Sequence, residues 1–136
     1  MKRSILLSAA IMFFTVLNAQ EEPKVKTEQN GVVITYQFSD LTGKRAEEGP
    51  QELCLFVKNN NSFNTEVKFS VVFFEDGAVD EESATLKLCV PAGKEVKGKK
   101  LGLCFLIDEE NDEQIKEGAF DWDINELSVE ESKTCK

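Results

Sequence analysis

The fold of this 136-residue chain is set by residues 66–75, EVKFSVVFFE. Successive side chains of a strand point to opposite faces, and here one face collects four large apolar residues: Val67, Phe69, Val71 and Phe73. The other face also carries apolar side chains, Val72 and Phe74. Because a strand that is apolar on both sides is buried on both sides, we expect this segment to be the central strand of a sheet.

The same alternation recurs on both sides of the central segment, at residues 32–38, 52–58, 84–90, 101–107 and 120–125. Turn-forming residues separate these segments, so the pattern predicts an all-β domain of six to seven short strands. Stacking two sheets buries one apolar face of every strand without helices, which favours a small β-sandwich over a small barrel. The alternation slips by one residue near Asn125 and Glu126, which predicts a β-bulge or a strand end.

The middle of the chain, from Leu53 to Phe105, resembles the immunoglobulin-like modules of exported proteins. The resemblance depends on the turn signals: a strand that ends in Asn59-Asn60, a long apolar strand closed by Asp76-Gly77, and a strand closed by Val90-Pro91-Ala92-Gly93. Antibody domains carry a buried tryptophan between two cysteines, whereas Trp122 lies in the last predicted strand. The resemblance therefore implies an immunoglobulin-like β-sandwich architecture and no particular activity.

The first 19 residues have the features of a secretory signal peptide. Lys2 and Arg3 precede an apolar stretch, which ends at Ala19 before Gln20. The stretch is too short for a membrane span, so we expect cleavage near Ala19-Gln20, a secreted or periplasmic location and no membrane insertion of the mature chain. The predicted domains are a signal peptide at 1–19, a flexible segment at 20–30, the β-sandwich at 31–129 and a C-terminal tail at 130–136 tied down by Cys135.

The mature chain is strongly acidic. Lys2 and Arg3 account for two of the 16 basic residues, which leaves 14 against 25 acidic residues. Binding to nucleic acid depends on Lys and Arg side chains that neutralise phosphates. We therefore expect no nucleic-acid partner, and the acidity is sufficiently explained by solubility.

Four cysteines lie in the mature part, an even number that predicts two disulfides in an exported domain: Cys54, Cys89, Cys104 and Cys135. Zinc sites of four thiolates use close pairs of cysteines, and the spacings here are 35, 15 and 31 residues. The sequence also contains no histidine. We accordingly predict no metal site and no cofactor.

The order of the strands favours one disulfide pairing. If each short loop reverses the chain, the strand of Cys54 is parallel to that of Cys89 and antiparallel to that of Cys104, and parallel neighbours require a long crossover. Pairing Cys54 with Cys104 places apolar residues opposite one another, Leu53 with Phe105 and Leu55 with Leu103, and sets Phe56 over Gly102 and Lys58 against Lys100. Cys89 then pairs with Cys135. The alternative is Cys89 with Cys104, which leaves Cys54 for Cys135.

The composition predicts no catalytic residues. Without histidine, the Ser-His and Cys-His nucleophile arrangements cannot be built. Asp121 and Asp123 share one face of a strand, and we interpret them as a solvated outer face. The acidic loops, with Asp76, Asp80, Glu81 and Glu82 in one and residues 108–113 in the other, leave calcium binding as an open alternative.

Four apolar residues point away from the expected core and form a candidate patch for a protein partner: Phe56, Val72, Phe74 and Leu106. The preferred hypothesis is a non-enzymatic exported binding or accessory module that acts through protein contacts with an unknown partner. The alternatives are an enzyme or enzyme inhibitor that uses the connection from Ser39 to Gln51, and a calcium-dependent adhesion module.

Overall fold

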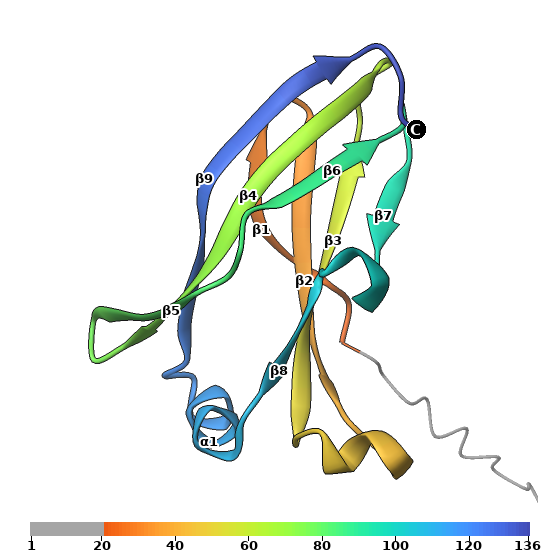
Figure 1. The fold of residues 1–136 in the computed structure, drawn as a ribbon. Coiled ribbons are helices and arrows are strands. Elements are labelled where there is room, and N and C mark those ends of the chain that lie inside the picture. Colours follow the sequence, from red (N-terminus) through yellow and green to blue (C-terminus); the bar gives the residue numbers. More distant parts are fainter. Residues whose placement is uncertain (1–20) are drawn as a thin grey trace, which may run out of the picture.

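The computed structural model describes residues 21–136, which form two antiparallel β-sheets packed face to face (Figure 1). The first sheet contains β1 (Lys24–Gln29), β2 (Val32–Asp40), β3 (Gln51–Asn59), β7 (Glu95–Lys97) and β8 (Cys104–Ile107). The second sheet contains β4 (Asn64–Glu75), β5 (Ala78–Glu82), β6 (Leu86–Val90) and β9 (Asp121–Ser132). The predicted β-sandwich with disulfides is therefore confirmed, but the fold is mostly β rather than all-β, because it includes one short helix. The predicted signal peptide lies outside the described residues.

The predicted central strand is central. β4 pairs with β9 from Asn64 to Phe74, and its other edge pairs with β6 and then with β5. Its inward side chains, such as Phe69 and Val71, are fully buried against residues of the first sheet such as Ile34 and Leu55. The core between the sheets thus consists of the alternating apolar residues that defined the strands.

The predicted β-bulge is present in β9. Ser70 of β4 pairs with Asn125 and Lys68 pairs with Ser128, so that Glu126 and Leu127 lie together opposite Phe69. Glu126 has a φ of 53°, in the left-handed region. The extra residue explains the slip in the alternation, because it returns the later side chains of β9 to the opposite phase.

The N-terminal segment differs from the expectation. Residues 20–30 were predicted to be flexible, but β1 occupies Lys24–Gln29 and pairs with β2. The two strands are joined at Asn30 and Gly31, with φ values of 47° and 76°, as in the tight turns that join antiparallel strands. The C-terminal tail also begins later than predicted, since β9 continues to Ser132.

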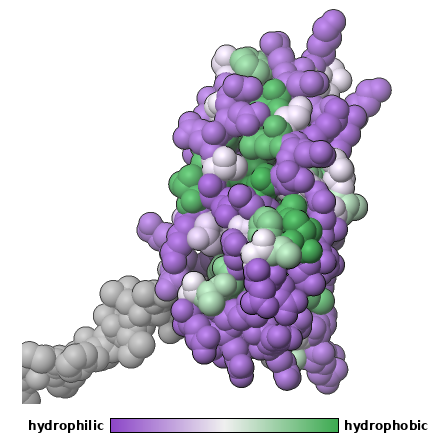
Figure 2. Space-filling model, turned by 90° about the vertical axis from the view of Figure 1, so that its left-hand side faces the viewer, coloured by the Kyte–Doolittle hydropathy of each residue, from purple (hydrophilic) through white to green (hydrophobic). Residues whose placement is uncertain are grey.

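β1 and β9 are edge strands of different sheets, and side chains of β1 close the gap between them. The Lys26 ammonium donates to the Trp122 carbonyl oxygen at 2.7 Å, and the Gln29 amide donates to the Leu127 carbonyl oxygen at 3.1 Å. Figure 2 shows the side of the molecule along which β9 runs, where apolar side chains lie among hydrophilic ones. The hydrogen bonds from Lys26 and Gln29 satisfy backbone carbonyls of β9 that an edge strand otherwise leaves unpaired.

Four elements occupy segments that were expected to be loops. They are β5, β7, a 3₁₀ turn at Gly43–Glu47 and a helix, α1, at Glu109–Glu117. A second 3₁₀ turn, at Lys99–Leu101, begins in an expected loop and replaces the first residue of the strand predicted at 101–107. The side chain of Asp108 caps α1 by accepting a hydrogen bond from the Asn111 amide at 2.8 Å. Asp112 fixes the helix to β3 by accepting from Gln51, and also accepts from Lys116 at 2.6 Å. None of the described helices is long and apolar enough to cross a membrane.

Candidate functional site

The outer face of the first sheet carries the most distinctive group of side chains. Strand alternation turns Glu52, Cys54 and Phe56 of β3 outward, while Leu53 and Leu55 enter the core. The neighbouring strands add outward residues at the same level, because Gln37 of β2 and Cys104 of β8 both pair with Cys54. We call this surface the disulfide face and define it by Val25, Thr35, Gln37, Glu52, Cys54, Phe56, Cys104 and Leu106.

The disulfide of this face joins Cys54 to Cys104, with Cα atoms 4.1 Å apart. The second disulfide joins Cys89 of β6 to Cys135, beyond the end of β9, with Cα atoms 5.3 Å apart. This is the preferred pairing from the sequence. The two bonds have different roles, because the first lies within one sheet and the second ties the C-terminal tail across β4 to β6.

The predicted register around Cys54 is correct as far as Leu55 and fails beyond it. Leu53 pairs with Phe105, and the Leu55 amide donates to the Leu103 carbonyl oxygen at 2.8 Å. Beyond this point the expected partners are wrong: Phe56 lies opposite Lys97 and Lys58 opposite Glu95, both in β7. A 3₁₀ turn at Lys99–Leu101 and a left-handed Gly102 end the pairing with β8, so β7 occupies the remaining edge of β3 and the unfavourable pair of lysines is avoided.

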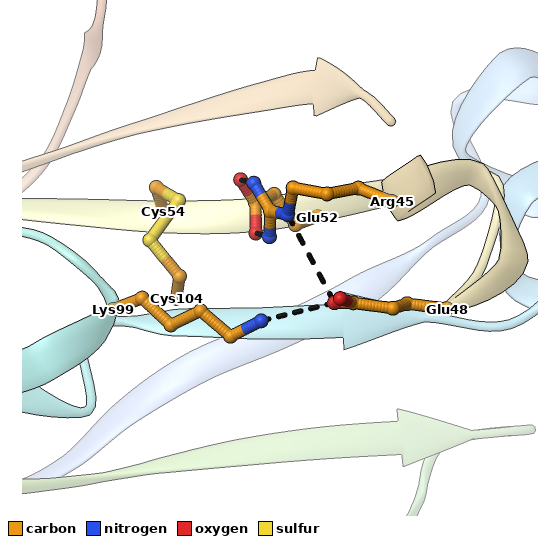
Figure 3. Close-up of a disulfide and its surroundings, with 6 residues drawn as sticks. All are labelled: Arg45, Glu48, Glu52, Cys54, Lys99 and Cys104. Carbon is orange, nitrogen blue, oxygen red and sulfur yellow. Dashed lines mark hydrogen bonds and ion pairs between the residues drawn. A yellow bond between two sulfur atoms is a disulfide. The ribbon is translucent and has the colours of Figure 1, made fainter. Parts of the chain in front are cut away.

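Three ion pairs lie beside the disulfide: Arg45 pairs with Glu52 and, at 3.9 Å, with Glu48, and Glu48 also pairs with Lys99 (Figure 3). The Arg45 guanidinium donates to both oxygens of Glu52, at 3.0 and 2.6 Å. Glu52 is only 8% exposed, so this two-point contact compensates the burial of its charge, and the hydrogen bond that Arg45 donates to Glu52 raises the pKa of Arg45. Lys99 lies 2.9 Å from Glu48, and this hydrogen bond lowers the pKa of the Glu48 carboxyl.

The four residues of the predicted partner patch lie on two opposite faces of the sandwich. Phe56 and Leu106 belong to the disulfide face, where Leu106 is 51% exposed and the Lys97 ammonium lies 5.8 Å from the centre of the Phe56 ring. Val72 and Phe74 lie on the outer face of the second sheet. Val72 is only 4% exposed, so it offers little surface to a partner.

The connection from Ser39 to Gln51 supplies two charged residues, Arg45 and Glu48, that form ion pairs beside the disulfide face. Its first two residues belong to β2 and its last to β3, and the Leu41 amide donates to the Pro50 carbonyl oxygen at 2.9 Å, which closes the loop. The 3₁₀ turn within it provides Arg45. No local pattern in the sequence marks Arg45 or Lys99 as a site residue, because nothing near them in the chain shows that a loop side chain will reach a strand on the same face. An enzyme or inhibitor that uses this loop stays a prediction.

The two acidic loops that suggested calcium meet at one end of the molecule. Asp80 and Glu81 line a pocket of about 190 Å³ together with Asp108. The Asp108 carboxylate is already engaged in capping α1. In the first loop, Glu82 accepts from Ser70 at 2.5 Å and from Asn125 at 3.1 Å, and these hydrogen bonds lower its pKa. Calcium binding stays a prediction.

The outward carboxylates of β9 also have local partners. Asp123 lies 3.5 Å from the Lys26 ammonium and accepts from the Ile124 amide at 2.8 Å. Asp121 and Asp123 are both exposed. This arrangement agrees with the solvated outer face that the sequence indicated.

Within residues 21–136, one group of side chains has the composition and spacing of a metal-ligand set. It comprises Glu52, Cys54 and Cys104, whose ligand atoms lie within 4.8 Å of one another. In the structure the two sulfur atoms are bonded to each other, so the group serves as a disulfide beside a paired carboxylate. Whether the sulfur atoms of this group are available as ligands therefore depends on whether the disulfide is oxidised or reduced.

The fold and the site define a small disulfide-linked protein of two antiparallel sheets packed as a sandwich. No known protein-family model, curated protein or solved structure matches the chain. The arrangement of its own residues is therefore the basis for the function considered next.

Proposed function

We propose that this chain is an exported, non-enzymatic binding or accessory module of immunoglobulin-like form, and that it contacts a partner protein through the disulfide face. The route of the chain supports the immunoglobulin-like architecture: it leaves the first sheet after β3, forms β4 to β6 in the second sheet, returns for β7 and β8, and ends in β9. Connections of this kind between two sheets are characteristic of such sandwiches. Export is supported by the predicted signal peptide and by the two disulfides.

The single observation that carries the proposal is the mixture of side chains on the disulfide face. Val25 is 65% and Leu106 51% exposed on this face. The half-buried Phe56 lies at the level of Val25, with Thr35 between them, and Leu106 lies opposite Glu52 on the other side of the Cys54–Cys104 pair. An aromatic residue and exposed aliphatic residues surrounded by paired charges are the composition of protein interfaces, which have an apolar centre and a polar rim.

The rigidity of this face also favours binding. The Cys54–Cys104 bond and the Arg45–Glu52 pair fix β3, β8 and the preceding loop relative to one another. A surface whose side chains are already ordered loses less entropy when a partner docks. The face therefore presents apolar area at a low entropic cost.

The proposal is tested by affinity capture from the native extracellular or periplasmic fraction with three forms of the mature protein. Leu106→Asp places a charge on the disulfide face, and Val79→Asp is its matched control, because Val79 is 60% exposed on β5 in the other sheet. We expect wild type and Val79→Asp to retain a protein that Leu106→Asp loses. Equal capture by all three forms would assign binding to another surface, and the absence of any captured protein would contradict the proposal.

A further inference from the structure

Backbone pairing holds the trio of Glu52, Cys54 and Cys104 in place in addition to the disulfide. Cys54 and Cys104 lie directly opposite each other in the β3–β8 pair, and Glu52 lies two residues earlier on the same face of β3. The hydrogen bond from the Leu55 amide to the Leu103 carbonyl oxygen fixes this register. Opening the S–S bond therefore leaves two thiols side by side with a carboxylate next to them.

We propose that, once the Cys54–Cys104 bond is reduced, these three side chains form a binding site for Zn²⁺. The S–S bond takes two electrons and two protons from a dithiol reductant, which is itself oxidised to a disulfide. The two thiols then release their protons when the metal binds. Two thiolate sulfurs and one carboxylate oxygen hold the ion, and water takes the fourth position of a tetrahedral site.

The distances suit this ion. Zn²⁺ binds sulfur at about 2.3 Å and carboxylate oxygen at about 2.1 Å, which places tetrahedral ligand atoms about 3.4–3.8 Å apart. The three ligand atoms already lie within 4.8 Å of one another. Side-chain rotation alone can separate the sulfurs and bring the carboxylate inward, with no movement of the strands. Thiolate ligands also select zinc over magnesium or calcium, which prefer oxygen.

The charges suit the ion as well. Two thiolates and one carboxylate carry three negative charges, so a bound Zn²⁺ leaves a net charge of −1, which the Arg45 guanidinium balances. Arg45 contacts both oxygens of Glu52, and it can keep one while the other turns to the metal. A group that holds a metal ligand from behind in this way orients it and strengthens binding.

The site is also accessible. Both cysteines lie on the outer face of the first sheet and are half-buried, so a reductant and a metal ion can reach them from solvent. Within residues 21–136, the Cys89–Cys135 bond has no third ligand of this kind beside it. The inference concerns the reduced chain alone and is independent of the partner-binding proposal.

Cobalt titration of the mature chain tests the inference, because Co²⁺ reports thiolate ligands by a charge-transfer absorption in the near ultraviolet. A Cys89→Ser/Cys135→Ser background leaves only the two relevant thiols, and a phosphine reductant opens their bond. We expect one Co²⁺ per reduced chain with the charge-transfer band, displacement by Zn²⁺, and no band in the oxidised chain. Glu52→Gln should weaken binding about tenfold or more while keeping the band, since both sulfurs remain.

Glu66→Gln is the matched control, because Glu66 is a paired carboxylate on the other sheet, 2.9 Å from Lys68. It should bind Co²⁺ like the background. The inference is overturned if the reduced chain shows no charge-transfer band, or if Glu52→Gln binds as tightly as Glu66→Gln. If reduction unfolds the background variant, recovery of its β-sheet circular dichroism on adding Zn²⁺ supports the inference, and failure to recover it overturns the inference.

Discussion

Removing the Cys54–Cys104 bond should lower the free energy of unfolding of the mature protein by an amount set by the length of the loop that the bond closes. The bond closes a loop of 50 residues, and the chain-entropy relation for a loop of that length gives about 4 kcal/mol. The Cys89–Cys135 bond closes a loop of 46 residues, for which the relation gives about 4 kcal/mol as well. We therefore expect Cys54→Ala/Cys104→Ala and Cys89→Ala/Cys135→Ala to lose nearly the same free energy of unfolding.

The two double variants are each other's controls in a urea titration followed by the fluorescence of Trp122. This tryptophan is the only one in the chain, and it is buried against Tyr36, with ring centres 5.1 Å apart. Near-equal losses support restriction of the unfolded chain as the main effect of both bonds. A loss below about 1 kcal/mol for the Cys54–Cys104 pair would refute this reasoning, since the relation predicts several times more.

Three further predictions concern the bulge, the acid response and calcium. Glu126→Gly should stabilise the protein by up to about 1 kcal/mol, because glycine adopts a positive φ without strain, whereas Glu126→Ala should give no gain; thermal denaturation of both variants checks this. Hydrogen bonds from Lys116 and Gln51 lower the pKa of Asp112 in the folded protein. The ionised carboxylate therefore stabilises the fold at pH values above its ordinary pKa, and this stabilisation is lost as the pH falls through the lowered pKa. Below about pH 4, the free energy of unfolding should therefore fall more steeply for wild type than for Asp112→Asn. Urea titrations of both proteins at several pH values check this, and the same dependence of unfolding free energy on pH in both would contradict the stabilising role of Asp112. Millimolar calcium should leave the melting temperature unchanged, because Asp108 and Glu82 already have partners, and an upward shift would favour the adhesion hypothesis.

The sequence was sufficient for elements whose burial gives them an alternating pattern. β4 could be placed at the centre because residues such as Phe69 and Val72 make it apolar on both faces. The pairing of Cys54 with Cys104 followed from strand direction and from the apolar register of Leu53 with Phe105. These inferences depend on the burial of apolar side chains, which requires apolar residues at alternate positions of a strand and is therefore visible in the sequence.

Elements held mainly by hydrogen bonds or with few apolar residues could not be predicted from the alternation. β1 is an edge strand with little apolar alternation, and its hydrogen bond from Lys26 to the Trp122 carbonyl oxygen joins residues 96 positions apart. Its one local signal was Asn30-Gly31, a strong indicator of a tight hairpin. The helix α1 brings only Ile115 to the core, so no helical period was visible.

The capping residues of α1 were nevertheless present in the sequence. Asp108 precedes an acidic first turn, Lys116 lies in the last turn, and Gly118 adopts a left-handed conformation at the C-terminal end. Each of these favours a helix by completing hydrogen bonds or opposing the helix dipole. Arg45 had no such signal, because its contact with Glu52 arises only when a loop folds back over the sheet.

The most direct test of the whole account is the disulfide map of the mature protein, because the register of β3 against β8 creates the disulfide face. Proteolysis without reduction, followed by mass spectrometry, identifies the linked peptides. The account predicts one peptide pair that joins Cys54 to Cys104 and another that joins Cys89 to Cys135. A peptide pair that joins Cys89 to Cys104 would contradict it, since Glu52, Phe56 and Leu106 would then no longer surround a bond on one face.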